Sequence, residues 1–132
     1  MNIEEYREYC LSLPKVEETL PFDDVTLVYK IGGKVFTLAT MEGFDHFAVK
    51  CDPDEAIELR ERYSAITPAF HLNKKHWNDI YVDQGLHEDF MHQQILSAYL
   101  LVARKSVTPK ALRVELLEII ERELGLGSKH KK

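Results

Sequence analysis

The stretch VTLVYKIGGKVFTLAT, residues 25–40, constrains the fold most strongly. Val25, Leu27, Tyr29 and Ile31 alternate with the residues between them, which is the period of a strand with one buried face. Gly32 and Gly33 follow and can supply the positive φ angles of a two-residue turn. The stretch therefore predicts an antiparallel hairpin, and the other elements must pack around it.

The flanking segments predict further helices and strands. Helices are expected over residues 3–12, 54–63, 88–103 and 109–124, and short strands over 46–51, 65–70 and 77–83. Asn2 and Glu5 have the spacing of a capping box. Asp52 and Thr108 are expected to cap the second and the last helix, and Gly125 to close the last one. Residues 15–24 are expected to form a linker.

This order of elements predicts an α+β protein. Hairpins and short connections favour an antiparallel sheet of about five strands, and helices are expected to cover one of its faces. The length of 132 residues suits a single domain, expected over residues 1–125. The remaining segment, 126–132, is basic and is expected to be a disordered tail.

The composition narrows the class of protein. The two cysteines, Cys10 and Cys51, are too few for a disulfide framework and are expected to be buried thiols. The N-terminal residues lack the apolar segment of a signal peptide, and no apolar run is long enough to span a membrane, so we expect a cytoplasmic protein. The net charge of −5 argues against strong binding to nucleic acid, because neutralising phosphates supplies most of that affinity.

Several stretches together resemble the MmcQ/YjbR family of small bacterial proteins. They are CLSLPKVEETLPF, VYKIGGKVFTLAT, VKCDPDEAIELRERY, ITPAFHLNKKHWNDIYVD and AYLLV, within residues 5–107. The most specific piece is HLNKKHW, which is similar to the family's Asn-Lys-x-His-Trp signature. The resemblance implies a frataxin-like fold, α-β(5)-α in outline. It also implies the label of DNA-binding proteins, and it brings no enzymatic activity and no cofactor.

The histidines do not predict a metal site. His87 and His92 are five residues apart, so on a helix they would point about 140° away from each other. His71 and His76 lie in a turn without a cysteine partner, which is too few ligands for a zinc site. No motif of nucleophilic catalysis or phosphate binding occurs in the sequence. We therefore expect a protein that is not an enzyme and binds no metal.

The stretch HLNKKHWNDI, residues 71–80, has two interpretations. In the structural one, Asn73 begins a turn and the ring of Trp77 anchors that turn to the core. In the functional one, Lys74 and Lys75 contact phosphates from the turn, with His76 beside them. Lys34, just after the hairpin turn, could add a third contact.

The sequence therefore predicts a binding module and leaves its partner open. Weak binding of DNA or another nucleic acid through the hairpin at 32–33 and the turn at 71–77 is the first hypothesis. The alternative is an adaptor that binds an unknown protein through the acidic N-terminal helix or the C-terminal helix.

Overall fold

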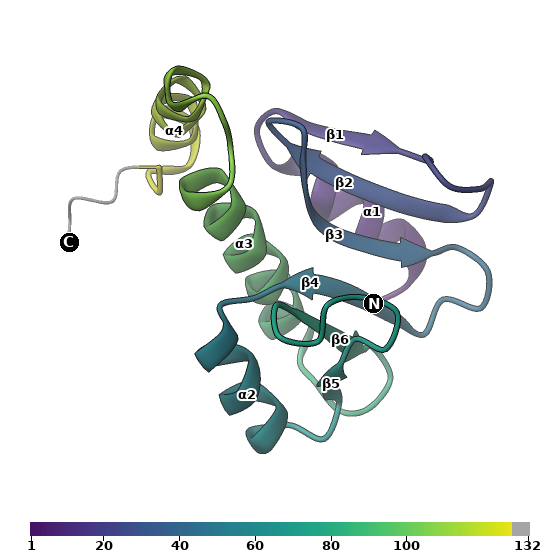
Figure 1. Cartoon of the computed structure of the whole chain (residues 1–132). Coiled ribbons are helices and arrows are strands. Elements are labelled where there is room, and N and C mark those ends of the chain that lie inside the picture. The colour runs from purple at the N-terminus through teal and green to yellow at the C-terminus, as the bar shows by residue number, and fades with distance from the viewer. Residues whose placement is uncertain (128–132) are drawn as a thin grey trace.

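The computed structural model describes residues 1–127, which form one antiparallel sheet and four helices (Figure 1). The strands are β1 (Val16–Thr19), β2 (Thr26–Ile31), β3 (Lys34–Thr40), β4 (His46–Lys50), β5 (Ile66–Pro68) and β6 (Trp77–Tyr81). The helices are α1 (Ile3–Ser12), α2 (Pro53–Arg62), α3 (Glu88–Lys105) and α4 (Lys110–Leu124). The strand order is β1-β2-β3-β4-β6-β5. The predicted α+β class and antiparallel sheet are confirmed.

The predicted hairpin is the pair β2–β3. Thr26 pairs with Thr40 and Ile31 with Lys34, so the turn falls on Gly32 and Gly33 as expected. The register shifts between Tyr29 and Lys30, which marks a bulge in the pair. This bulge allows Phe36 and Thr37, neighbours in sequence, both to be fully buried.

Three helices cover one face of the sheet. The long helix α3 packs on β2, β3 and β4, while α1 packs against β1 and α2 against β5. In Figure 1, α1 lies behind the strands. Aromatic rings fill the space between these layers: Tyr6 lies 5.6 Å from Tyr29 and 5.2 Å from Phe47, and Phe36 lies 5.4 Å from Tyr99. The opposite face of the sheet carries no helix within residues 1–127.

The tyrosines of the core place their hydroxyl groups on polar partners. Tyr6 Oη is 2.9 Å from Thr37 Oγ1, and Tyr99 donates to the carbonyl of Pro14 at 2.6 Å. Tyr29 donates to Glu18 at 2.6 Å. Because an unsatisfied hydroxyl would be costly in this interior, these bonds fix the positions of α1, α3 and β1 on the sheet.

The expectation of a linker over residues 15–24 is wrong in its first half, because residues 16–19 form the edge strand β1. The sheet therefore has six strands rather than about five. Two of the four residues are glutamates, which hides the strand from a hydrophobic pattern. Glu18 explains the pairing: it accepts two hydrogen bonds from Arg7 at 3.0 Å and one from Tyr29. These contacts lower the pKa of Glu18, the bond from Arg7 contributing most.

The helix ends follow the sequence signals with one exception. Asn2 and Glu5 form the predicted capping box, Asp52 caps α2, and Gly125 ends α4 with a φ of 72°. Thr108 does not cap α4: the cap residue is Pro109, which makes no side-chain bond. Pro109 has an extended ψ of 173°, so it lies outside the helix, which begins one residue later than expected.

The segment after α4 begins inside the folded part. The carbonyl of Leu126 accepts a hydrogen bond from Arg104 on α3 at 2.6 Å. Residue 127 is buried. The expectation of a disordered tail is therefore wrong for residues 126 and 127, and its remainder, 128–132, lies outside the described residues.

Two further expectations concern single features. Both cysteines are free and buried, as predicted. Among residues 1–127, no helix combines the length and the apolar character that crossing a membrane requires.

The hairpin turn gives a matched pair of substitutions. Both glycines have positive φ, at 59° and 81°. A Cβ atom on Gly32 would lie 2.8 Å from both methyl carbons of Val107, whereas a Cβ on Gly33 would meet nothing within 4 Å. We predict that Gly33→Ala lowers the free energy of unfolding by about 1–2 kcal/mol, the cost of positive φ alone. Gly32→Ala should cost a further 1–3 kcal/mol or so because of crowding. Urea denaturation measures both, and equal midpoints for the two variants would contradict this packing.

Candidate binding face of the sheet

The face of the sheet opposite the helices presents a regular set of side chains on β4 and β6. Side chains alternate along a strand, and Phe47, Val49 and Ile80 belong to the core. Their neighbours must therefore lie on the open face. The register pairs Lys50 with Trp77, Ala48 with Asp79, and His46 with Tyr81. This face thus combines aromatic, basic and acidic groups in adjacent positions.

The structure corrects the predicted role of Trp77. The sequence predicts that its ring anchors the turn to the core, but Trp77 is half-buried and lies outside the core cluster. Its ring lies on the open face instead, with Lys50 Nζ 5.4 Å from the ring centroid. The residue marks the start of β6, as expected, and its ring is available at the surface.

The turn before β6 has the predicted geometry. Asn73 Oδ1 accepts a hydrogen bond from the amide of Lys75 at 2.9 Å, and the Asn73 carbonyl accepts from the amide of His76 at 3.1 Å. The His76 carbonyl in turn accepts from the amide of Cys51 at 2.7 Å, which ties the turn to the end of β4. Lys74 and Lys75 are exposed at its tip, and His76 is half-buried.

Arg60 of α2 holds this turn in place, a role that the sequence does not suggest. Its Nε donates to Asn78 Oδ1 at 2.6 Å, and its guanidinium also donates to the carbonyl of Lys74. Asn78 is fully buried and donates to the carbonyl of Ala56 at 3.3 Å. The helix layer thereby fixes the loop from which the two lysines project.

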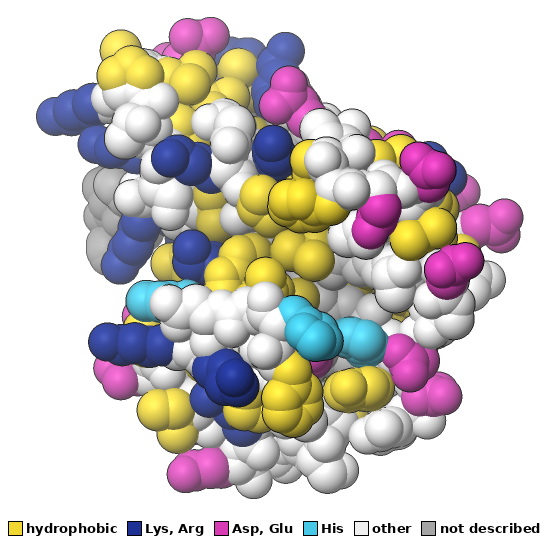
Figure 2. All heavy atoms as spheres, turned by 45° about the vertical axis from the view of Figure 1, so that its right-hand side comes forward, with side chains coloured by type: hydrophobic (Ala, Val, Ile, Leu, Met, Phe, Trp, Pro, Cys, Tyr) yellow, Lys and Arg dark blue, Asp and Glu magenta, His cyan; other side chains and the backbone are white. Residues whose placement is uncertain are grey.

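A second ring, which is exposed, lies in the loop before β6. Phe70 is 67% exposed, and Lys74 Nζ lies 5.8 Å from its ring centroid. Figure 2 shows hydrophobic and histidine side chains side by side near the middle of one face of the molecule. In that view Lys and Arg gather mostly on the left and Asp and Glu mostly on the right. The loop and the start of β6 therefore present one aromatic ring each, and each ring has an ammonium group near its face.

The β2–β3 hairpin does not project freely from the protein surface. Its tip lies against the junction of α3 and α4, where Gly32 faces Val107 and Leu116. Lys34 is exposed beside it, at the end of the sheet where β4 ends and β6 begins. The predicted site residues thus lie at one end of the sheet: Lys74, Lys75 and His76 in one turn, and Lys34 two strands away.

Asp79 is the least expected group on the open face. Only 8% of the residue is exposed, and burial is the main reason why the pKa of its carboxyl is raised. His46 and His71 oppose this rise; the Nε2 of His46 lies 3.9 Å from the carboxylate, and its Nδ1 lies 2.6 Å from Asp45. Thr67 pairs with Asp79 across β5–β6, and its buried Oγ1 has no hydrogen-bond partner among the described residues.

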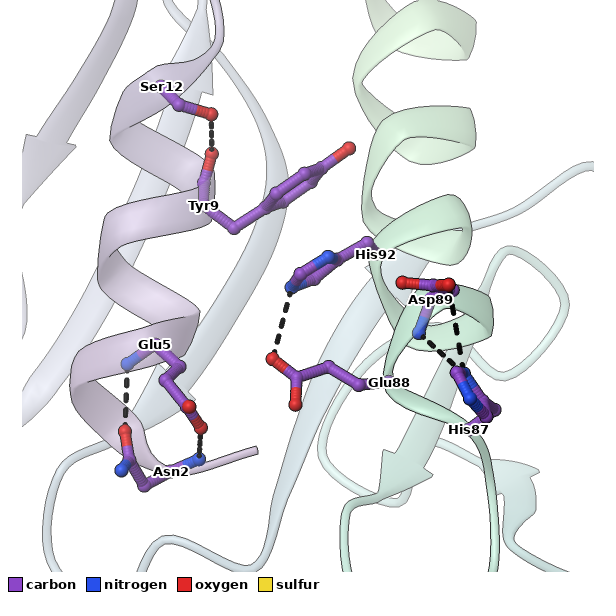
Figure 3. A network of polar contacts seen from close by, with 8 residues as sticks. All are labelled: Asn2, Glu5, Tyr9, Ser12, His87, Glu88, Asp89 and His92. Atoms are coloured by element: carbon purple, nitrogen blue, oxygen red, sulfur yellow. Dashed lines mark hydrogen bonds and ion pairs between the residues drawn. The ribbon is translucent and has the colours of Figure 1, made fainter.

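His87 and His92, the two ends of the stretch HEDFMH, contact different partners (Figure 3). His87 caps α3 by accepting from the amide of Asp89 at 3.2 Å. His92 stacks on Tyr9 with the ring centroids 4.2 Å apart and lies 3.7 Å from Glu88. Within residues 1–127, no three His, Cys, Asp or Glu side chains are grouped so that they could hold a metal ion. The histidines at 87 and 92 therefore serve to cap α3 and to join it to α1.

A separate groove of about 460 Å³ lies between α2 and α3. Its lining combines cations such as Lys50 and Arg104 with the carboxylates of Glu55 and Glu58. Cys51 lies in the lining, but burial raises the pKa of its thiol to about 11. A thiol with that pKa is protonated near neutral pH and is a poor nucleophile.

These features define a class: small α+β domains whose antiparallel sheet carries helices on one face and a mixed aromatic and charged surface on the other. A family model described as YjbR matches residues 11–101, so the chain belongs to the YjbR family. It is 34% identical over 97 residues to the uncharacterized protein YbdF of Escherichia coli O157:H7, covering 73% of this chain and 80% of YbdF. It is 28% identical over 100 residues to the uncharacterized protein YjbR of E. coli K12, covering 75% and 85% of the two chains.

Two solved structures have a similar fold. Protein DR2400 of Deinococcus radiodurans, described as a DUF419 domain, superposes with a TM-score of 0.81 at 34% identity. The match covers 98% of this chain and 96% of that one. A protein from Pseudomonas syringae superposes with a TM-score of 0.65 at 20% identity, over 76% of this chain and 98% of that one. At that identity the second likeness concerns the fold alone.

The position of Trp77 on the surface predicts a modest effect on stability. Trp77→Ala should lower the free energy of unfolding by about 1–2 kcal/mol, since it removes a half-buried ring and its contact with Lys50. Ile80→Ala, on the same strand but in the core, should cost about 2–5 kcal/mol. Urea denaturation of both variants tests the assignment of faces, and a larger loss for Trp77→Ala than for Ile80→Ala would contradict it.

The burial of Asp79 predicts a substitution that stabilises the protein. A carboxyl with a raised pKa in the folded state favours folding only when protonated, so its ionisation destabilises the fold as the pH rises above the unfolded value of about 3.9. Asp79→Asn should therefore raise the free energy of unfolding at pH 7, and this gain should shrink as the pH falls toward 4. Thermal denaturation across this range measures the difference. A destabilised variant at pH 7 would show that the ionised carboxylate is stabilised by its histidine neighbours.

Proposed function

We propose that this protein binds single-stranded nucleic acid weakly, at the end of the open sheet face where the turn of residues 69–76 meets Lys50 and Trp77. The observation that carries the proposal is the pairing of two surface rings with lysines, Phe70 with Lys74 and Trp77 with Lys50. A base can stack on such a ring, and the displaced ammonium group can then contact phosphate. The resemblance to a family labelled DNA-binding supports the same reading.

The geometry favours a single strand over a duplex. The hairpin tip packs against Val107 and is not free to enter a groove of a duplex. Rings on a sheet can accept only bases that are unstacked from their neighbours, as those of a single strand are. The proposed contact surface is therefore the turn rather than the hairpin. Lys34, at the same end of the sheet, is an additional phosphate contact.

The affinity should be low. The net charge of −5 repels a polyanion, and the cations at this end of the sheet are few. We expect a dissociation constant in the non-specific range of about 10⁻⁴ to 10⁻⁶ M. Binding at this strength suits a protein that acts on nucleic acid at high local concentration or together with a partner.

A protein partner is the second candidate, favoured by a different surface. Phe22, between β1 and β2, is 77% exposed, and Leu20 beside it is 47% exposed. Such apolar exposure at the edge of a sheet is typical of contact sites. Leu11 on α1 and Val114 on α4 are exposed as well, so this surface adds to the two helices of the adaptor hypothesis.

The lysines of the turn provide the test. We predict that Lys74→Ala combined with Lys75→Ala weakens binding to a labelled single strand at least tenfold at about 50 mM salt, where charge contacts are strongest. The slope of log K against log salt should fall by about 1.4, which corresponds to two lost contacts with a single strand. Fluorescence anisotropy measures both quantities.

The control removes the same charge elsewhere. Lys110→Ala with Arg122→Ala changes two exposed cations of α4 and should leave the affinity within about twofold of the wild type, since long-range effects are screened. Equal losses in the two double variants would mean that net charge alone governs binding. A wild type without saturable binding at low salt would refute the proposed function.

A further inference from the structure

We propose that Asp79 and Thr67 form a base-recognition subsite on the open face, selective for guanine over the other bases. This inference rests on the proposed function and adds a preference to it. Trp77, Asp79 and Tyr81 alternate along β6 on the open face, so the carboxylate lies between two aromatic positions. The ring of Tyr81 is already stacked on His46, with the centroids 4.9 Å apart, so a base stacked on the ring of Trp77 would bring its edge over Asp79.

The surroundings of Asp79 leave its carboxylate without a strong donor. Its closest ion-pair partner within residues 1–127 is His46, whose Nε2 lies 3.9 Å away, beyond hydrogen-bond distance. That histidine is itself engaged by Asp45 at 2.6 Å. A buried carboxylate in such a position is costly, and costly polar groups are found mainly where a ligand uses them.

Thr67 adds a second polar group whose hydrogen-bonding capacity is unused. It pairs directly with Asp79 across β5–β6, so both side chains point to the open face. The Oγ1 of Thr67 is buried and has no partner among the described residues. The Oγ1 of Thr67 has almost no solvent-exposed surface in this conformation, so it can donate to a base only if the site opens as the ligand enters. The pair then offers two acceptor oxygens and one adjustable donor.

Guanine is the base whose edge matches this set. It presents two neighbouring N–H groups, at N1 and N2, which suit the two oxygens of one carboxylate, and its O6 can accept from a hydroxyl. Thymine and uracil present a single N–H between two carbonyl oxygens, which a carboxylate repels. Adenine and cytosine each present one amino group beside an acceptor nitrogen. Only 11% of the Asp79 side chain is exposed, so only an edge of a base can reach it.

A cationic ligand fits this face less well. Lys50 and Lys74 lie over the two neighbouring rings, where a cation would have to compete with them. Burial raises the pKa of the Asp79 carboxyl, and His71 on the exposed turn opposes this rise, so a basic side chain already lies near the carboxylate. The lysines favour a ligand that carries phosphates next to an N–H-bearing ring, which describes a nucleotide.

The test compares three labelled ten-residue DNA strands by fluorescence anisotropy at about 50 mM salt, where weak binding is measurable. One is all thymine, one carries two central guanines, and one carries inosine in their place, which lacks the N2 amino group. We expect the guanine strand to bind about tenfold tighter than the thymine strand, with inosine between them. Asp79→Asn should abolish this preference and, because it removes a negative charge, should bind the thymine strand slightly more tightly than the wild type does.

Asp83→Asn is the matched control, because it removes the same charge from an exposed carboxylate that lies just after β6. It should strengthen binding of all three strands equally and keep the order of preference. Equal binding of the guanine and thymine strands by the wild type would overturn the subsite and leave the proposed function standing. Absence of saturable binding to all three strands would overturn both.

Discussion

The packing of helices on one face of the sheet is the constraint on which the rest of the structure depends. Helices α1, α2 and α3 cover the face that carries Phe47 and Ile80, and the tyrosine hydroxyls of that layer find polar partners. Because side chains alternate along each strand, the same arrangement turns every second residue toward the opposite face. The open face therefore displays a surface whose spacing is set by the core.

The covered and open faces are linked through Arg60 and Asn78. Asn78 is buried beneath α2, and the guanidinium of Arg60 joins it to the carbonyl of Lys74. Packing of α2 is thereby transmitted to the turn that carries the two exposed lysines. A rigid loop loses less conformational entropy when it binds, which matters for a protein with few cations and low expected affinity.

The elements that depend on local patterns could be predicted from the sequence. The hairpin, the capping box at Asn2 and the cap at Asp52 each rest on a few neighbouring residues, and all are found. Strand β1 could not be predicted in this way, because its stability comes from Arg7 and Tyr29, which are distant in sequence from Glu18. Thr108 has the residue type of a cap, yet the proline after it takes that position.

The candidate site was predictable only in part, for the same reason. The residue type of Asn73 predicts the turn from the local sequence, and Lys74 and Lys75 are exposed, as expected for residues in a turn. The large ring of Trp77 suggests a core residue, but the face it occupies follows from its pairing with Lys50 on another strand. The alternation of Ile80 with Asp79 and Tyr81 could have indicated that Trp77 shares the polar face. Arg60 and Thr67 have no local signal, since their roles depend on contacts that the fold creates.

The most direct test of the open face as a binding surface is a titration of ¹⁵N-labelled protein with a short thymine strand at low salt, followed by amide chemical shifts. The account predicts saturable shifts in residues 69–77, at Lys50 and along β6, with little change in α1 and α4. Shifts confined to those two helices, or no saturable shifts at all, would contradict it.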